Sequence, residues 1–216
     1  MNRAGVPLLE IVSEPDLRSA EEVDAFMSSM RQLIRYLEIS DGNMQEGSMR
    51  CDCNVSVRKK GDEQLGNRCE VKNLNSMRYA RKAIAFEVKR QIDLIESGGK
   101  VLQETLNFNP ATGVTTPIRD KEDAHDYRYF PEPDLPPLFI KKTRATSDKA
   151  TDAFYLDEIE SSLPELPSQK RKRFQKEYWL DFQHADTFTK TPDLADYFEQ
   201  IASELRNWIK VEDKTK

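Results

Sequence analysis

The chain has 216 residues, 38% of them hydrophobic and 33% charged, which is enough for one domain or for one domain and part of a second. No apolar run reaches the roughly 18–20 residues that a membrane span needs, and no secretion signal is recognisable, so we expect a soluble, cytoplasmic protein. Three cysteines argue against a disulfide framework, and a net charge of -5 argues against a basic nucleic-acid-binding surface.

The first predicted element is a short buried strand over residues 6–12. This segment, VPLLEIV, is apolar apart from Glu10. Burying that carboxylate costs several kcal/mol unless it is paired or bound to a metal, so Glu10 is a candidate site residue. The strand has no earlier segment to pair with, so we expect it to pair further along the chain or to belong to a longer protein.

A helix is predicted over residues 20–37. Ser19 and Glu22 have the spacing of a capping box at its start. Apolar residues then recur at intervals of three and four along one face, which is typical of core packing.

Two strands are predicted next, over residues 49–58 and 67–72. Polar and apolar residues alternate in both, and the polar connection over residues 59–66 favours an antiparallel hairpin. If the strands pair, one face of the hairpin carries the polar residues Arg50, Asp52, Asn54, Glu70 and Lys72.

A second helix is predicted over residues 77–96, opened by Ser76 and stopped by Gly98 and Gly99. Its periodicity directs one set of residues inward: Ala80, Ala83, Ile84, Val88, Ile92 and Ile95. Residues 101–140 are expected to form further strands and loops, with a turn over residues 109–113.

Beyond residue 146 the strand signals disappear, and short helices are predicted over residues 149–163, 168–178, 181–189 and 192–208. The fold class we expect is α+β. Residues 1–145 would form the C-terminal part of a mixed-sheet cradle domain, and residues 146–216 the start of a small all-α domain.

The polar hairpin face has the composition of a magnesium–nucleotide site. Carboxylate oxygens bind Mg²⁺, and basic side chains neutralise phosphate oxygens. The spacing alone is a weak signal, because a solvated strand face with surface ion pairs has the same pattern. Cys51, Cys53 and Cys69 fall on the apolar side of the hairpin, where three small buried side chains are the better interpretation and a zinc site the weaker one.

Four segments of the sequence resemble one known family in the same order. They are residues 2–16 (NRAGVPLLEIVSEPD), 46–56 (EGSMRCDCNVS), 70–76 (EVKNLNS) and 126–134 (DYRYFPEPD). These segments are similar to the B-subunit family of bacterial and organellar aspartyl/glutamyl-tRNA amidotransferases. Residues 194–199 and 207–209 resemble that family's helical domain, so the likeness covers nearly the whole chain.

The resemblance implies an ATP- and Mg²⁺-dependent enzyme of translation. In this family the protein phosphorylates the side-chain carboxylate of Glu or Asp misacylated onto tRNA(Gln) or tRNA(Asn). Its partners are an amidase A subunit, which supplies ammonia from glutamine, and a small C subunit. The resemblance places Glu10, Asp52 and Glu70 in the catalytic site around Mg²⁺. The strand geometry adds Arg50 and Lys72 as phosphate contacts and Asn54 as a polar positioner.

The family also has a long segment before the residues that match Asn2 and a C-terminal tail domain, so we expect this chain to be a fragment with little activity alone. An alternative interpretation is a non-catalytic tRNA-binding or scaffold module, in which Glu10, Asp52 and Glu70 form structural ion pairs.

Overall fold

The computed structural model describes residues 6–118, 133, 134, 136–149 and 153–214, with side chains described as far as residue 209. The fold is α+β, as predicted. The chain divides into two compact units, which are described separately. The first comprises Met1–Ser29 and Met44–Ile118, and the second Met30–Asn43 and Arg119–Lys216. The predicted domain boundary at residue 145 stays a prediction.

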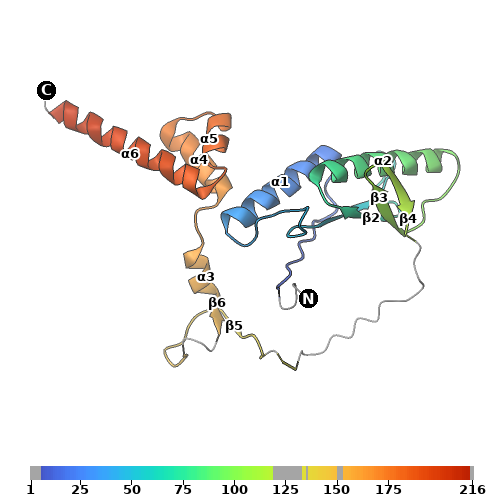
Figure 1. The fold of residues 1–216 in the computed structure, drawn as a ribbon, viewed down its shortest axis with the longest axis horizontal. Coiled ribbons are helices and arrows are strands. Elements are labelled where there is room, and N and C mark those ends of the chain that lie inside the picture. Colours follow the sequence, from blue (N-terminus) through green and yellow to red (C-terminus); the bar gives the residue numbers. More distant parts are fainter. Residues whose placement is uncertain (1–5, 119–132, 135, 150–152, 215–216) are drawn as a thin grey trace. The chain divides into compact units, whose positions relative to one another are not determined.

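A mixed four-stranded sheet forms the centre of the first unit (Figure 1). Its strands, in both chain and spatial order, are β1 (Cys51–Val55), β2 (Cys69–Leu74), β3 (Glu104–Asn109) and β4 (Val114–Pro117). β1 and β2 are antiparallel, β2 and β3 parallel, and β3 and β4 antiparallel. The predicted hairpin is therefore confirmed, although its strands cover 51–55 and 69–74.

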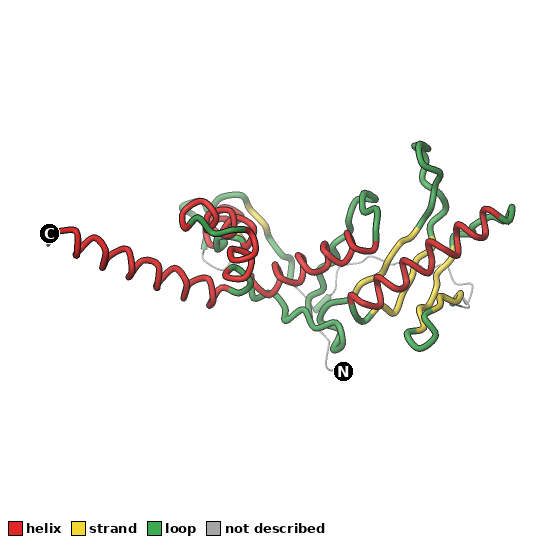
Figure 2. The backbone as a smooth tube through the Cα atoms, turned by 90° about the horizontal axis from the view of Figure 1, so that it is seen from above, coloured by secondary structure: helices red, strands yellow, loops and turns green. Residues whose placement is uncertain are grey.

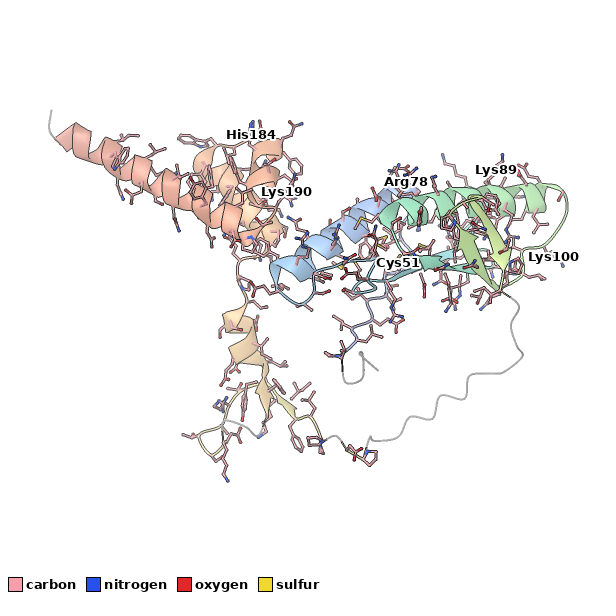
Figure 3. All side chains as sticks on the ribbon, in the orientation of Figure 1. Cys51, Arg78, Lys89, Lys100, His184 and Lys190 are labelled. Carbon is pink, nitrogen blue, oxygen red and sulfur yellow. The ribbon has the colours of Figure 1, made fainter. Side chains whose placement is uncertain are left out.

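Helix α2 (Met77–Glu96) has the predicted bounds and lies over the sheet, as Figure 2 shows. Ser76 caps the helix, because its hydroxyl accepts a hydrogen bond from the backbone N–H of Tyr79 at 3.1 Å. The helix is also the crossover that two parallel strands require, since it connects β2 to β3. Arg78 and Lys89 point away from the sheet (Figure 3).

Helix α1 (Ala20–Tyr36) begins as predicted and ends one residue before the predicted end. The Ser19 hydroxyl accepts from the backbone N–H of Glu22 at 3.1 Å, and the Glu22 carboxylate accepts from the backbone N–H of Arg18. In a standard capping box the Glu22 carboxylate would accept from the backbone N–H of the N-cap residue Ser19, whereas here it accepts from that of Arg18. Met27 of α1 is buried in the core of the first unit.

The inward face of α2 differs from the prediction along its second half. Ala80, Ala83 and Ile84 are buried as expected, but Ile92 and Ile95 are 41% and 42% exposed. Two polar residues, Glu87 and Gln91, are fully buried in their place. Hydrophobicity alone predicted the wrong inward face for the second half of α2. The buried positions that face the sheet are occupied there by polar residues of a hydrogen-bonded network.

The predicted buried strand over residues 6–12 was wrong. This segment contains no regular secondary structure, and its apolar side chains are exposed, with Leu8 at 78% and Val12 at 79%. Glu10 is exposed as well. Glu10 therefore needs no cation to compensate for burial in this structure.

The second unit is mainly helical. It contains α3 (Leu156–Ser162), α4 (Pro167–Tyr178), α5 (Phe182–Phe188) and α6 (Pro192–Lys214). Phe174, Ala185 and Ala195 form the centre of its core, and the Phe198 ring stacks on Phe188 with centroids 4.4 Å apart. The expectation that strands end before residue 146 was incomplete, since β5 (Ile140–Lys141) pairs in parallel with β6 (Phe154–Tyr155). Within the described part of the chain, no helix is long and apolar enough to cross a bilayer.

Candidate functional site

The sheet presents a row of polar side chains on the face opposite its buried residues, which we call the polar face. Cys53, Val55, Val71, Leu106 and Phe108 are buried in the core. Because successive strand residues point to opposite sides, their neighbours form the polar face. These neighbours are Asp52 and Asn54 on β1, Glu70 and Lys72 on β2, Thr105 and Asn107 on β3, and Thr116 on β4.

Strand pairing brings the polar side chains of separate strands side by side. Asn54 lies opposite Glu70, and Glu70 lies opposite Thr105. Lys72 is paired with Asn107, which in turn faces Thr116 on β4. The predicted grouping of Arg50, Asp52, Asn54, Glu70 and Lys72 on one face is therefore confirmed for the last four, whereas Arg50 lies outside β1.

A β-bulge interrupts β2 next to Asp52. Cys53 pairs with Val71 and Cys51 with Leu74, so Lys72 and Asn73 together stand opposite the single residue Asp52. Asn73 adopts a φ of 64°, a left-handed conformation that asparagine tolerates better than most residues. Its side-chain amide donates to Asn107 Oδ1 at 3.2 Å, which connects the bulge to β3. This bulge was not predicted, and Asn73 was the one residue whose type pointed to it.

Glu70 is held from two sides. Thr105 Oγ1 donates to Glu70 Oε2 at 3.3 Å, and Lys72 Nζ lies 3.4 Å from Glu70 Oε1. The side chains of Glu70 and Lys72 are 34% and 44% exposed, so the carboxylate is oriented but reachable from solvent. An ionised carboxylate has about four acceptor positions, which leaves some free for a ligand.

The remaining predicted site residues lie at or beyond the edge of this arrangement. Asp52 is exposed on β1, and Arg50 is exposed just before that strand. Among the residues that the structure describes, no three His, Cys, Asp or Glu side chains are grouped closely enough to hold a metal ion, so Glu10 does not join Asp52 and Glu70 in such a group. Most of residues 126–134, the fourth segment that resembles the family, lies outside the described residues.

A buried polar network on the other side of the sheet was not predicted. Glu87 Oε1 accepts from Arg90 Nη2 at 2.7 Å and from Gln91 Nε2 at 2.8 Å. Glu87 Oε2 accepts from Arg90 Nε at 2.9 Å and from Thr115 Oγ1 at 3.0 Å. Burial raises the pKa of Glu87, but the bonds from Arg90 and Gln91 and the charge of Arg90 outweigh it, so the net pKa is lowered.

This network connects α2 to every strand of the sheet. Beyond Thr115 on β4, Gln91 Nε2 donates to the Val55 carbonyl on β1 at 3.0 Å. Arg90 Nη2 reaches Cys69 Sγ on β2 at 3.5 Å and Glu104 Oε1 on β3 at 3.4 Å. The spacing of Glu87, Arg90 and Gln91 at i, i+3 and i+4 was the signal that could have identified it. The network fixes the sheet on which the polar face is built.

Cys51, Cys53 and Cys69, all within the described residues, are not grouped closely enough to hold a metal ion. Cys51 Sγ and Cys53 Sγ lie 3.7 Å apart, and Cys51 is at the start of β1 (Figure 3). Cys69 is fully buried and donates to the Leu102 carbonyl at 3.3 Å. The interpretation of these residues as small core side chains agrees with their burial.

In the second unit, two basic side chains of α4, Lys170 and Arg173, are paired with carboxylates. Lys170 Nζ lies 2.9 Å from Asp196 Oδ1, and Arg173 Nη1 lies 2.6 Å from Glu199 Oε1. Burial lowers the pKa of Lys170, but the bond to Asp196 and nearby negative charges raise it overall. These contacts hold α4 against α6 and leave the two cations committed within the protein.

The donor set of the polar face suits a magnesium–phosphate complex. Asp52 and Glu70 offer carboxylate oxygens, and Lys72 places a positive charge 3.4 Å from Glu70. Mg²⁺ is commonly held by one or two carboxylates together with water and substrate phosphates, so a third acidic residue is not required. The residues present therefore fit both the ion and a phosphate-bearing ligand.

The comparison with known families concerns the part of the chain that contains this sheet. Residues 1–146 match the family model described as the GatB/GatE catalytic domain. The chain belongs to this family.

Curated relatives of this chain are named as the B subunit of an aspartyl/glutamyl-tRNA(Asn/Gln) amidotransferase. The relative from Pseudomonas fluorescens strain Pf-5 is 51% identical over 98% of this chain and 43% of its own length. The relative from Halorhodospira halophila is 54% identical over 97% of this chain and 42% of its own length. The chain thus spans less than half the length of these relatives.

Proposed function

We propose that this chain is the sheet-bearing part of the B subunit of a tRNA-dependent amidotransferase, and that its polar face lies in the site where a carboxylate is activated by ATP. The substrates would be Glu-tRNA(Gln) and Asp-tRNA(Asn), and the partners the amidase A subunit and the small C subunit. The observation that carries this proposal is the oriented, accessible Glu70 beside Lys72, in a chain of the GatB/GatE family.

The proposed reaction is a phosphoryl transfer followed by an amide-forming step. A side-chain carboxylate oxygen of the aminoacyl group attacks the γ-phosphorus of ATP, the bond to the β-phosphate oxygen breaks, and ADP leaves. Ammonia then attacks the resulting acyl phosphate, inorganic phosphate leaves, and the nitrogen loses a proton. Catalysis of the first step depends on positioning and on neutralising phosphate charge.

Four residues of the polar face and Arg50, just before β1, have a stated part in this proposal. Asp52 and Glu70 would hold Mg²⁺, which supplies neutralising charge to the phosphates, whereas Glu10 is not grouped with them in this structure. Lys72 and Arg50 would contact phosphate oxygens directly, and Asn54, opposite Glu70, would hydrogen-bond a bound substrate.

The test uses Glu70→Gln in the full-length protein, assembled with its partner subunits. Removing one charge from the transition-state site is expected to lower ATP-dependent amidation on the order of 100-fold. Assembly, tRNA binding and glutamine hydrolysis are measured on the same preparation and are expected to persist. Glu63→Gln, in the exposed hairpin connection, is the matched control.

Unchanged amidation by the Glu70→Gln protein would contradict the proposal. The polar face would then be a structural surface, in agreement with the scaffold interpretation. Loss of tRNA binding or assembly together with amidation would likewise assign Glu70 to the architecture and not to the activation step.

A further inference from the structure

We infer that Thr105 is a positioning residue that orients the Glu70 carboxylate toward a divalent cation. This inference rests on the proposed function of the polar face. Thr105 stands on a different strand from Glu70, and the four segments that resemble the family do not include it. Only the parallel pairing of β2 with β3 brings the two side chains together.

The contact between the two residues has a defined geometry. Thr105 is the register partner of Glu70, and its hydroxyl donates to Glu70 Oε2 at 3.3 Å. The backbone of Thr105 is fixed on its other side, because its carbonyl accepts from the N–H of Ile118 at 2.9 Å. A β-branched side chain has few rotamers, so the hydroxyl is presented from a nearly fixed position.

Lys72 alone would orient Glu70 poorly. Its ammonium lies 3.4 Å from Glu70 Oε1 at the end of a flexible chain, and its side chain is 44% exposed. Exposed ion pairs of this kind restrict geometry little, because side-chain entropy and solvent screening offset the attraction. The Thr105 hydroxyl therefore sets the carboxylate plane, and it occupies one lone pair of Oε2 while the others stay available.

Positioning partners of this kind are known to matter for metal sites. Groups that hydrogen-bond a metal-binding carboxylate typically change metal affinity or activity by about 10–100-fold when they are removed. We therefore expect Thr105→Val, which removes the hydroxyl and keeps the branched shape, to weaken cation binding by roughly tenfold.

The experiment measures binding of Mn²⁺ by electron paramagnetic resonance to the assembled full-length complex, in the presence of a non-hydrolysable ATP analogue. Thr105→Val and Thr105→Ala both remove the hydroxyl, whereas Thr105→Ser keeps it. Thr112→Val is the matched control, since Thr112 is an exposed residue in the turn between β3 and β4 and lies outside the polar face. The expected result is weakened Mn²⁺ binding for the first two variants, near-normal binding for Thr105→Ser, and no change for Thr112→Val.

Several results would overturn the inference. Normal Mn²⁺ binding by Thr105→Val or Thr105→Ala would show that the hydroxyl does not orient the site. Equal weakening by Thr112→Val or by Thr105→Ser would show a general disturbance of the sheet. Glu70→Gln in the same assay separates the two proposals. If Glu70→Gln loses Mn²⁺ binding while Thr105→Val binds normally, only the inference about Thr105 is wrong. If Glu70→Gln shows normal Mn²⁺ binding and normal amidation, the proposed function itself is wrong.

Discussion

Replacing Glu87 by glutamine should loosen helix α2 from the sheet. The Glu87 carboxylate is fully buried and accepts four hydrogen bonds, from Arg90 twice, from Gln91 and from Thr115. A glutamine has about the same shape, but its NH₂ group would face donors where an oxygen now accepts. The buried charge pair with Arg90 would be broken at the same time.

The magnitude follows from the burial of both partners. Breaking a buried ion pair by removing one member costs about 3–5 kcal/mol. Because the Arg90 side chain is 30% exposed and retains some hydration, we expect a cost below that range, about 2–3 kcal/mol. Since each 1.4 kcal/mol is tenfold in an equilibrium constant, amides of α2 should exchange roughly 30–150-fold faster.

Hydrogen exchange followed by mass spectrometry on the full-length protein measures this change at the level of α2. Glu96→Gln, an exposed residue of the same helix, is the matched control and should leave exchange unchanged. If Glu87→Gln and Glu96→Gln show equal protection of α2, the network contributes nothing to stability and the reasoning is refuted.

The same network predicts a pH dependence. The pKa of Glu87 in the folded protein lies below the ordinary glutamate value of 4.5. A carboxyl with a lowered pKa stabilises the fold fully above its unfolded pKa, and this contribution is lost as the pH falls from there through the folded pKa. Protection of α2 should therefore decline below about pH 4.5 in the native protein, and this decline should be smaller in Glu87→Gln.

Two further predictions concern the hairpin. Asn73→Val should destabilise β2 by about 1–2 kcal/mol, because the left-handed backbone at this position disfavours a β-branched side chain. Asn73→Gly should cost less, since glycine adopts this conformation readily. Hydrogen exchange of β2 checks both variants, and equal effects would contradict this reasoning. Iodoacetamide should label Cys51 before Cys53. The hydrogen bond between the two thiols lowers the pKa of Cys51, whereas that bond and burial raise the pKa of Cys53. Peptide mass spectrometry checks the order of labelling, and earlier labelling of Cys53 would refute the prediction.

The helices were the most predictable part of this fold. The periodicity of residues 77–96 and the capping serine defined α2 to the residue, because helical contacts join positions three and four apart. The alternation of residues 51–55 assigned Asp52 and Asn54 to the polar side of their strand, because successive strand residues point to opposite faces. Together with Glu70 and Lys72, four of the seven residues of the polar face were therefore predicted before the fold was known.

Errors arose where burial depends on distant partners. Ile92 and Ile95 are hydrophobic and yet half-exposed, while Glu87 is fully buried because Thr115 and Arg90 satisfy its oxygens. Residues 6–12 are apolar and nevertheless exposed, with no strand formed. The hydrophobicity of a residue indicates how much free energy its exposure to water costs. Whether the residue is buried depends on a neighbouring element that it can pack against.

The amino-acid sequence by itself determined the α+β class, the bounds of α2, the antiparallel hairpin and the residues of its polar side. Only the tertiary structure decided that β3 pairs in parallel beside β2, which sets Thr105 against Glu70 and connects Asn107 to the bulge at Asn73. The physical reason is separation along the chain. Turns and helices are governed by residues a few positions apart, whereas pairing of strands some thirty residues apart depends on packing α2 over the sheet, and no local pattern encodes it.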